Sequence, residues 1–125
     1  MSTDGVVTQG RPVVRYQVGQ YVVVEVSGDL DLYSAPWLFA ALTDLRRSSC
    51  NLVIVDMAAV DFMDSSGLGV LIGGVKWTRA KGGALVLCGA PERVLRILRV
   101  TGVVKVLPVF ETLPEAVVYL EKAEW

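Results

Sequence analysis

Two adjacent serines, Ser65 and Ser66, follow Asp64 in the segment DSSGLG. Hydroxyls beside a carboxylate could act as a nucleophile, cradle a phosphate, accept a phosphoryl group or cap a helix. The chain contains no histidine, so a Ser-His-Asp triad is impossible and the usual nitrogen ligands of zinc are missing. Cys50 and Cys88 stand apart without CxxC spacing. We therefore expect no metal or other cofactor, and two buried, reduced thiols.

Three catalytic or phosphate-binding motifs come close to this segment without matching it. GLGVLIG resembles GxGxxG but has one residue too many between its second and third glycines, and no GK[ST] follows as in a P-loop. The nucleophile elbow GxSxG needs a glycine two positions before the serine, where Ser65 has Met63 and Ser66 has Asp64. These comparisons leave a serine at a helix N-terminus.

A serine at that position is suited to phosphorylation. The phosphoryl group adds about −1.5 to −2 charges, which the helix amides and the helix dipole can accept without unfolding the domain. The same charge would repel an acidic partner and disturb an apolar contact nearby. Phosphorylation would therefore act as a switch on binding.

The helix that follows the serines has two different sides. At 100° per residue, one side gathers the residues predicted to face the core, Leu68, Leu71, Ile72 and Val75. The opposite side gathers Ser66, Gly69, Val70, Gly73 and Trp77. Each interior glycine costs the helix roughly 1 kcal/mol relative to alanine. Close packing on the chain's own sheet would explain Gly74, whereas outward glycines beside apolar side chains indicate a partner surface.

Aspartates are frequent around the same region. If the strand ends face one edge of the sheet, five of them would form an acidic rim, namely Asp29, Asp31, Asp56, Asp61 and Asp64. A divalent-metal site is one interpretation of such a rim. Acids also suit turns and helix starts, and this second interpretation is favoured.

The hydrophobic pattern of the whole chain predicts the strands and helices that position these residues. Strands are expected at 13–18 and 21–27, joined as a hairpin, and at 52–55, 85–88 and 104–109, the last weakened by Pro108. Four helices are expected. The first begins at Ser34, its N-cap, and the second covers 65–81; the third runs from Pro91 to Gly102, and the fourth covers 113–123. The residues expected to face inward are Leu38, Ala41, Leu42 and Leu45 in the first helix, and Val94, Ile97, Leu98 and Thr101 in the third.

This order predicts a single α/β domain with a mixed sheet, an N-terminal hairpin followed by parallel strands, flanked by about four helices. Residues 1–11 are expected to be a flexible arm and residues 12–125 the domain. The chain has 125 residues, 53% of them hydrophobic, and a net charge of −1. Nucleic acid is therefore not expected as a partner. Neither a signal peptide nor a membrane-spanning run is visible, so a cytoplasmic protein is expected.

Three segments of the chain together resemble the STAS domain of bacterial anti-sigma factor antagonists. They are FMDSSGLGVLIG, the preceding SGDLDLYSAPWL and the following GGALVLCGAPERVLRILRVTGVVKVLPVFET. The resemblance extends from about Val13 to Leu120. It implies a non-enzymatic switch. The unphosphorylated protein would bind an anti-sigma factor, itself a serine kinase, and release a sigma factor. Phosphorylation would prevent binding, and a metal-dependent serine phosphatase would restore it.

Carried onto this chain, the resemblance makes Ser65 the phosphate acceptor. Asp31 matches the second acid of a GELD-like motif, in which Asp29 replaces the commoner glutamate. The expected partner-binding residues are Asp29, Asp31, Asp64, Ser66, Gly67, Gly69, Val70, Gly73 and Trp77. Bulky Trp37, Phe39 and Trp77 would influence which anti-sigma factor is recognised.

Two alternatives stay open. A STAS subunit of a lipid-transporting ABC system, or of a large stress-signalling complex, would use a similar loop only for docking. A small nucleotide-binding or hydrolytic enzyme would use Ser65 as a nucleophile, but without a histidine base this alternative is disfavoured.

Overall fold

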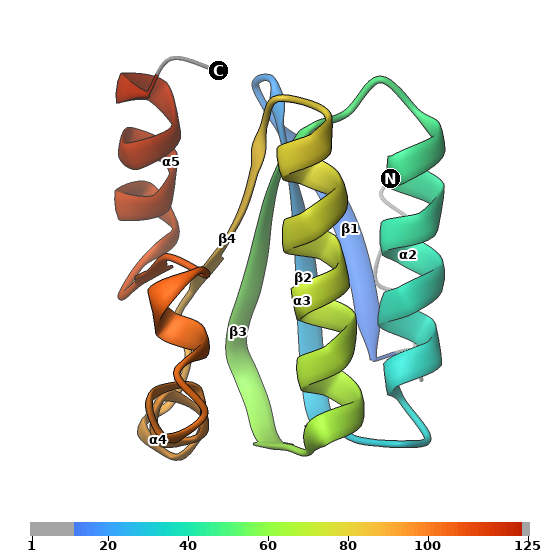
Figure 1. Ribbon diagram of the computed structural model, residues 1–125, viewed down its shortest axis with the longest axis vertical. Coiled ribbons are helices and arrows are strands. Elements are labelled where there is room, and N and C mark those ends of the chain that lie inside the picture. The colour runs from blue at the N-terminus through green and yellow to red at the C-terminus, as the bar shows by residue number, and fades with distance from the viewer. Residues whose placement is uncertain (1–11, 124–125) are drawn as a thin grey trace.

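A five-stranded sheet organises the computed structural model, which describes residues 12–123 (Figure 1). The strands are β1 (Val13–Val18), β2 (Tyr21–Leu30), β3 (Leu52–Met63), β4 (Ala84–Cys88) and β5 (Val109–Phe110). The helices are α2 (Ala35–Arg47), α3 (Ser65–Ala80), α4 (Glu92–Val100) and α5 (Leu113–Lys122), with a 3-10 turn, η1 (Val103–Lys105). The predicted arm, residues 1–11, lies outside the described residues.

The strands follow one another across the sheet in chain order, from β1 to β5. β1 and β2 pair antiparallel as a hairpin, and each later pair is parallel. The predicted mixed sheet is therefore confirmed. Because β2, β3 and β4 run in the same direction, their carboxyl ends lie at one edge of the sheet, where α3 begins.

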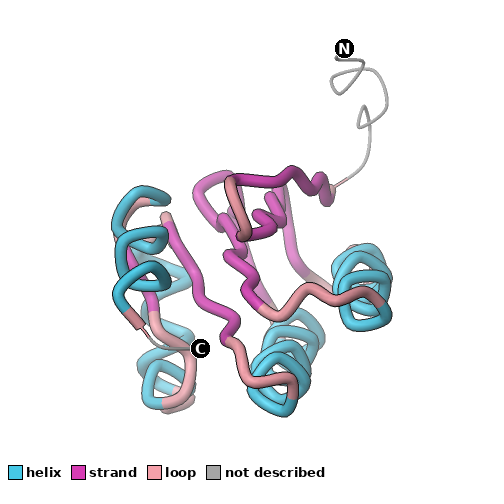
Figure 2. Tube along the Cα trace, turned by 90° about the horizontal axis from the view of Figure 1, so that it is seen from above, coloured by secondary structure: helices cyan, strands magenta, loops and turns pink. Residues whose placement is uncertain are grey.

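Both faces of the sheet are covered by helices, which explains the continuous apolar character of the central strands. Val53 and Val55 of β3 point into a large core with α2, α3 and α4, whereas Ile54 points into a smaller core beneath α5. Figure 2 shows the helices on the two sides of the strands.

Two strands are longer than the sequence predicted. The expected strand ends at Ser27 and Val55 are wrong, because β2 and β3 continue pairing as far as Leu30 and Met63. Their register shifts twice, and each shift inserts one extra residue on the β3 side. These bulges break the regular alternation of apolar residues, so the segment from Met57 to Met63 resembled a loop.

The region after α4 also differs from the prediction. The expected strand over 104–109 is wrong, since Val103–Lys105 forms η1 and only Val109–Phe110 pairs with β4. Val103 and Leu107 are buried one helical turn apart, joined by a hydrogen bond from the Leu107 amide to the Val103 carbonyl of 3.0 Å. Thr101, predicted to face inward, is exposed.

The remaining helices begin and end close to the predicted residues. In α2, Leu38, Leu42 and Leu45 are buried as expected, and α3 ends at Ala80 beside the predicted stop at Gly82. Within residues 12–123, no helix combines the length and the apolar character that crossing a bilayer requires.

Candidate functional site

The site begins where β2 and β3 end together. Leu30 is paired with Met63, and the carbonyl of Leu30 accepts a hydrogen bond of 3.1 Å from the Asp64 amide. Gly67, in the first turn of α3, lies so close to Leu30 that a Cβ added there would be 2.6 Å from the Leu30 Cγ. Gly67 is thus buried, and it lets the start of α3 dock onto the end of β2.

Asp64 is the residue that caps α3. Its Oδ1 accepts hydrogen bonds from the amides of Ser66 (2.8 Å) and Gly67 (3.4 Å), and its backbone carbonyl accepts from the Leu68 amide at 3.1 Å. The Asp64 side chain therefore satisfies two of the four amides that a helix start leaves without an intrahelical partner.

Because Asp64 caps the helix, neither Ser65 nor Ser66 is needed as the N-cap of α3. Ser65 is the first residue of α3 and is exposed, whereas Ser66 is half-buried. Within the part of the chain that the structure describes, the Ser65 hydroxyl makes no hydrogen bond. Ser65 is thus held at a fixed position with an accessible hydroxyl.

Asp31 organises the neighbouring loop between β2 and α2. Its Oδ1 accepts from the amides of Tyr33 (3.0 Å) and Ser34 (3.1 Å). The Ser34 hydroxyl accepts from the Asp31 amide at 2.9 Å and donates to the carbonyl of Asp29. Ser34 was predicted to cap α2 with its side chain, but its hydroxyl makes no capping hydrogen bond and instead closes the loop.

This loop and the adjoining end of β3 present large apolar side chains to solvent. Tyr33 is 85% exposed and Leu32 is 66% exposed, and Phe62 on the adjoining end of β3 is 47% exposed. Sequence reasoning did not assign these three residues to the site. The available signal was the adjacent pair Leu32 and Tyr33 in a turn, where polar residues are usual.

A groove of about 510 Å³ lies between α2 and α3 and reaches the serines. From α2 it is lined by Phe39, Leu42, Thr43 and Arg46, and from α3 by Ser65, Ser66, Gly69, Val70, Gly73, Gly74 and Trp77. The helices run side by side in the same direction, with both starts at the edge where β2 and β3 end (Figure 1). Most of the predicted partner-binding side of α3 thus lines one groove.

The glycines of α3 have different surroundings. A Cβ on Gly69 or Gly73 would meet nothing within 4 Å, so these two glycines open the groove. A Cβ on Gly74 would lie 2.6 Å from the Leu85 Cδ1 and 3.2 Å from the Leu42 Cδ1. Gly74 is therefore required for packing on the chain's own sheet, as its position in the sequence suggested.

Trp77 corrects one expectation. It was predicted to point outward, but it is only 8% exposed and belongs to the main core. The helical wheel treated the sheet as the only surface that buries α3, whereas α2 also covers one flank of that helix. Trp77 borders the groove from inside rather than standing on the surface.

The predicted acidic rim is incomplete. Asp29 is paired with Phe62 beside Asp61, near the start of α3. Asp56 lies further back in β3, level with Glu25 and Cys88, and its Oδ1 accepts from the Ala58 amide at 3.0 Å. Over residues 12–123 there is no cluster of three carboxylates or thiols able to hold a metal ion.

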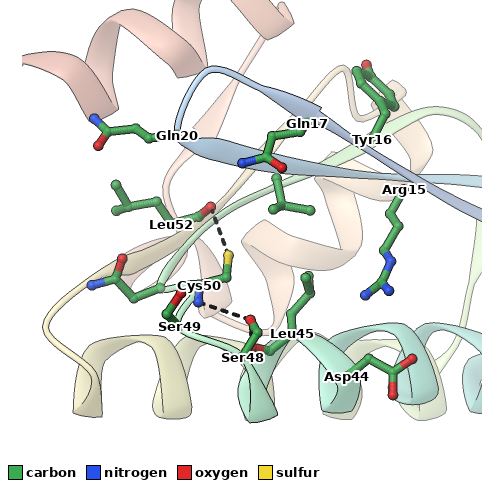
Figure 3. Close-up of a pocket in the computed structure, with 12 residues that line it drawn as sticks. Arg15, Tyr16, Gln17, Gln20, Asp44, Leu45, Ser48, Ser49, Cys50 and Leu52 are labelled. Atoms are coloured by element: carbon green, nitrogen blue, oxygen red, sulfur yellow. Dashed lines mark hydrogen bonds between the residues drawn. The ribbon is translucent and has the colours of Figure 1, made fainter.

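A second pocket, of about 680 Å³, lies at the opposite edge of the sheet, between the hairpin and the loop after α2 (Figure 3). Arg15 projects from the hairpin toward α2 near Asp44, and in the loop after α2 the Ser48 hydroxyl accepts from the Cys50 amide at 3.0 Å. This pocket contains none of the residues assigned to the site. Cys50 and Cys88 are free thiols, and burial raises the pKa of Cys88 to about 12.

Comparison with known proteins places this geometry in a class. The STAS domain family model matches residues 12–116. The anti-sigma F factor antagonist of Paenibacillus polymyxa is 31% identical over 101 residues, which are 80% of this chain and 86% of that protein. The anti-sigma-B factor antagonist of Bacillus subtilis is 35% identical over 88 residues, 70% of this chain and 80% of that protein.

The fold agrees with these relatives. The crystal structure of an anti-sigma factor antagonist from Mycobacterium paratuberculosis superposes with a TM-score of 0.81 at 25% identity, covering 88% of this chain and 93% of that one. The chain therefore belongs to the STAS domain family and groups with its anti-sigma factor antagonists. That class consists of regulatory proteins and not of enzymes.

Proposed function

We propose that this protein binds an anti-sigma factor when Ser65 is unphosphorylated, thereby releasing a sigma factor, and that phosphorylation of Ser65 switches binding off. The observation that carries the proposal is the position of Ser65. Its hydroxyl is exposed and unbonded among residues 12–123, and it stands at the mouth of the groove between α2 and α3. The family relationship supports the identity of the partner.

The binding surface combines the groove with the loop beside it. In this proposal Ser66, Gly69, Val70 and Gly73 receive the partner in the groove. Asp29, Asp31 and Asp64 would contact the partner from the end of β2, the loop after it and the start of α3, although Asp31 and Asp64 also hold the loop and the helix start in place. Leu32, Tyr33 and Phe62 add exposed apolar area. Gly67 and Trp77 support this surface without facing the partner. Gly67 lets α3 dock on β2, and Trp77 borders the groove from the core side.

The phosphate would act mainly through charge and bulk. Asp64 already occupies the Ser66 and Gly67 amides, so a phosphoryl group on Ser65 would not displace an ordered contact of the fold. It would add about −1.5 to −2 charges beside the Asp64 carboxylate. The positive end of the α3 dipole tolerates this charge. A partner approaching the groove would meet both the charge and the added volume.

The proposal includes two enzymes acting on this chain in the cytoplasm. The anti-sigma factor itself is the serine kinase, so binding and modification use the same surface. A metal-dependent serine phosphatase removes the phosphate. Placing the acceptor at an exposed helix start supports this cycle, because both enzymes need access to the Ser65 Oγ.

Substitution of Ser65 tests the proposal. Ser65→Ala should bind the purified anti-sigma factor with the affinity of the wild type, and Ser65→Asp at least about tenfold more weakly, since one desolvated like charge is expected to cost more than 1 kcal/mol. Ser66→Ala is the matched control and should still be phosphorylated. Isothermal titration calorimetry measures the affinities, and phosphopeptide mapping locates the phosphate. Equal affinities of the two Ser65 variants, or a phosphate found elsewhere, would refute the proposal.

A further inference from the structure

A single lysine joins the two walls of the groove at the end remote from Ser65. Lys81 follows α3 directly, and its Nζ donates hydrogen bonds to the backbone carbonyls of Arg46 (2.9 Å), Ser48 (2.6 Å) and Cys50 (3.0 Å). An ammonium group has three hydrogens, so all of them are used by the end of α2 and the loop that follows. The Arg46 carbonyl belongs to the last turn of α2, the negative end of its dipole, which a cation stabilises, and the other two carbonyls follow it in the loop.

The same lysine is fixed from the α3 side. Its Nζ lies 5.2 Å from the centre of the Trp77 ring, at a distance typical of a cation–π contact. Its carbonyl accepts a hydrogen bond of 3.1 Å from the Asn51 side chain. A Cβ on Gly83 would lie 1.9 Å from the Asn51 carbonyl oxygen, so the turn after α3 is pressed against the loop after α2. Lys81 therefore connects the turn after α3 to the loop after α2, two segments whose backbones lie close together.

The serine end of the groove lacks a comparable connection. Gly69 and Gly73 offer no side chain to α2, and a Cβ at either position would touch nothing within 4 Å. Further along α3, a Cβ added at Gly74 would lie 3.2 Å from the Leu42 Cδ1, so the backbone of α3 approaches a side chain of α2 closely there. Arg46 and Trp77, which border that far end of the groove, are both bound to Lys81. Among the described residues, the polar connection between the two helix ends is thus found at the lysine end of the groove.

We infer that Lys81 is a positioning residue of the partner-binding groove. By binding three carbonyls at the end of α2 and in the loop after it, while its Nζ lies over the Trp77 ring, Lys81 sets the spacing between α2 and α3. This inference rests on the proposed function, since it concerns the same groove. Lys81 does not line the groove and is not expected to touch the partner. Its influence reaches the partner through the relative position of the two helices.

Lys81→Met tests the inference, because methionine keeps the aliphatic stem and removes every donor. Spin labels on Ala40→Cys in α2 and Lys76→Cys in α3, both exposed positions, report the helix spacing in a Cys50→Ser background. Lys81→Met should broaden or shift the distance distribution measured by electron paramagnetic resonance. In label-free protein, it should raise the Kd for the purified anti-sigma factor about fivefold or more. Lys122→Met on α5 is the matched control and should change neither quantity.

An unchanged distance distribution would overturn the inference, as would a changed distribution with an unchanged Kd. If Lys81→Met does not fold, Lys81→Arg is measured by the same criteria, because a planar guanidinium cannot converge three donors from one nitrogen. If the wild-type protein does not bind the anti-sigma factor, the proposed function fails. In that case the distance distribution still decides whether Lys81 sets the helix spacing.

Discussion

At the scale of single residues, the neighbours Asp64 and Ser65 have separate tasks that their order in the sequence did not assign. The sequence located both serines at a helix start and marked Ser65 by resemblance. It could not distinguish a capping hydroxyl from a free one, because aspartate and serine are both good N-caps. The structure separates them through the Asp64 Oδ1, which lies 2.8 Å from the Ser66 amide.

Tyr33 provides a test of the part of the surface that sequence reasoning missed. Its side chain is 85% exposed, so Tyr33→Ala should change the free energy of unfolding by less than about 0.5 kcal/mol. Exposed tyrosines at the centre of interfaces often contribute more than 1 kcal/mol to binding, so the affinity for the anti-sigma factor should fall about tenfold. Val100→Ala, at a site on α4 that is 79% exposed, is the control and should bind normally. Unchanged binding by Tyr33→Ala would remove this loop from the surface.

Cys88 gives a prediction about alkaline stability. Burial, followed by the carboxylates of Asp56 and Glu25, raises the pKa of its thiol from the ordinary 9.0 to about 12. Between these values the unfolded chain loses a proton that the native chain keeps, so the free energy of unfolding falls as the pH rises. Burial also raises the pKa of Tyr16, which acts in the same direction.

Urea unfolding at several pH values above 8 measures this effect. The midpoint should fall with pH in the wild type and fall less steeply in Cys88→Ala. Val86→Ala is the matched control, since Val86 is buried on the same face of β4 and its loss leaves the thiol in place. Parallel pH slopes for the wild type and Cys88→Ala would contradict the assignment.

At the scale of elements, helix patterns were predicted well and strand ends poorly. The four-residue stripe of α2 and the capped segment of α3 depend on local periodicity, which the sequence carries directly. The ends of β2 and β3 depend on each other, through a register that shifts twice between Glu25 and Asp29. Trp77 was misplaced for a similar reason, because the packing of α2 beside α3 is a property of two elements together.

Gly73 and Gly74 allow two adjacent positions of α3 to be compared. Gly73→Ala should stabilise the protein by about 0.5 to 1 kcal/mol, because the new methyl group meets nothing and the helix gains propensity. Gly74→Ala should destabilise it by about 1 kcal/mol or more, because its Cβ would lie 2.6 Å from the buried Leu85 Cδ1. Chemical denaturation checks both values.

The larger variant Gly73→Leu tests the groove itself. It should remain folded and bind the anti-sigma factor at least about tenfold more weakly, because the leucine occupies volume that the partner needs. A folded Gly73→Leu variant with wild-type affinity would show that the partner does not enter the groove. An unfolded variant would show that Gly73 faces the protein's own core.

At the scale of the whole molecule, one sheet supports two cores with different relations to the site. The core beneath α2, α3 and α4 lies under the groove, and the core beneath α5 lies on the other face (Figure 2). The sequence predicted helices on the sheet but could not assign each one to a face. That assignment follows from the crossovers and from which side chains of β3 and β4 each helix covers.

Leu120 tests whether the two faces unfold together. It is 1% exposed in α5, so Leu120→Ala should lower the free energy of unfolding by about 2 to 5 kcal/mol. Circular dichroism and tryptophan fluorescence should give coincident urea transitions, because both cores share the same strands. The affinity of the folded protein for the anti-sigma factor should be unchanged. Val118→Ala, 47% exposed in the same helix, is the control.

The capping role of Asp64 has a consequence for how long a signal lasts. Its side chain already takes the amides of Ser66 and Gly67, so the fold offers a phosphate on Ser65 few donors that could retain or shield it. The modified serine would stay open to hydrolysis by the phosphatase. In the proposed cycle, the lifetime of the phosphorylated state would therefore be set by the kinase and the phosphatase that act on Ser65, and not by the fold.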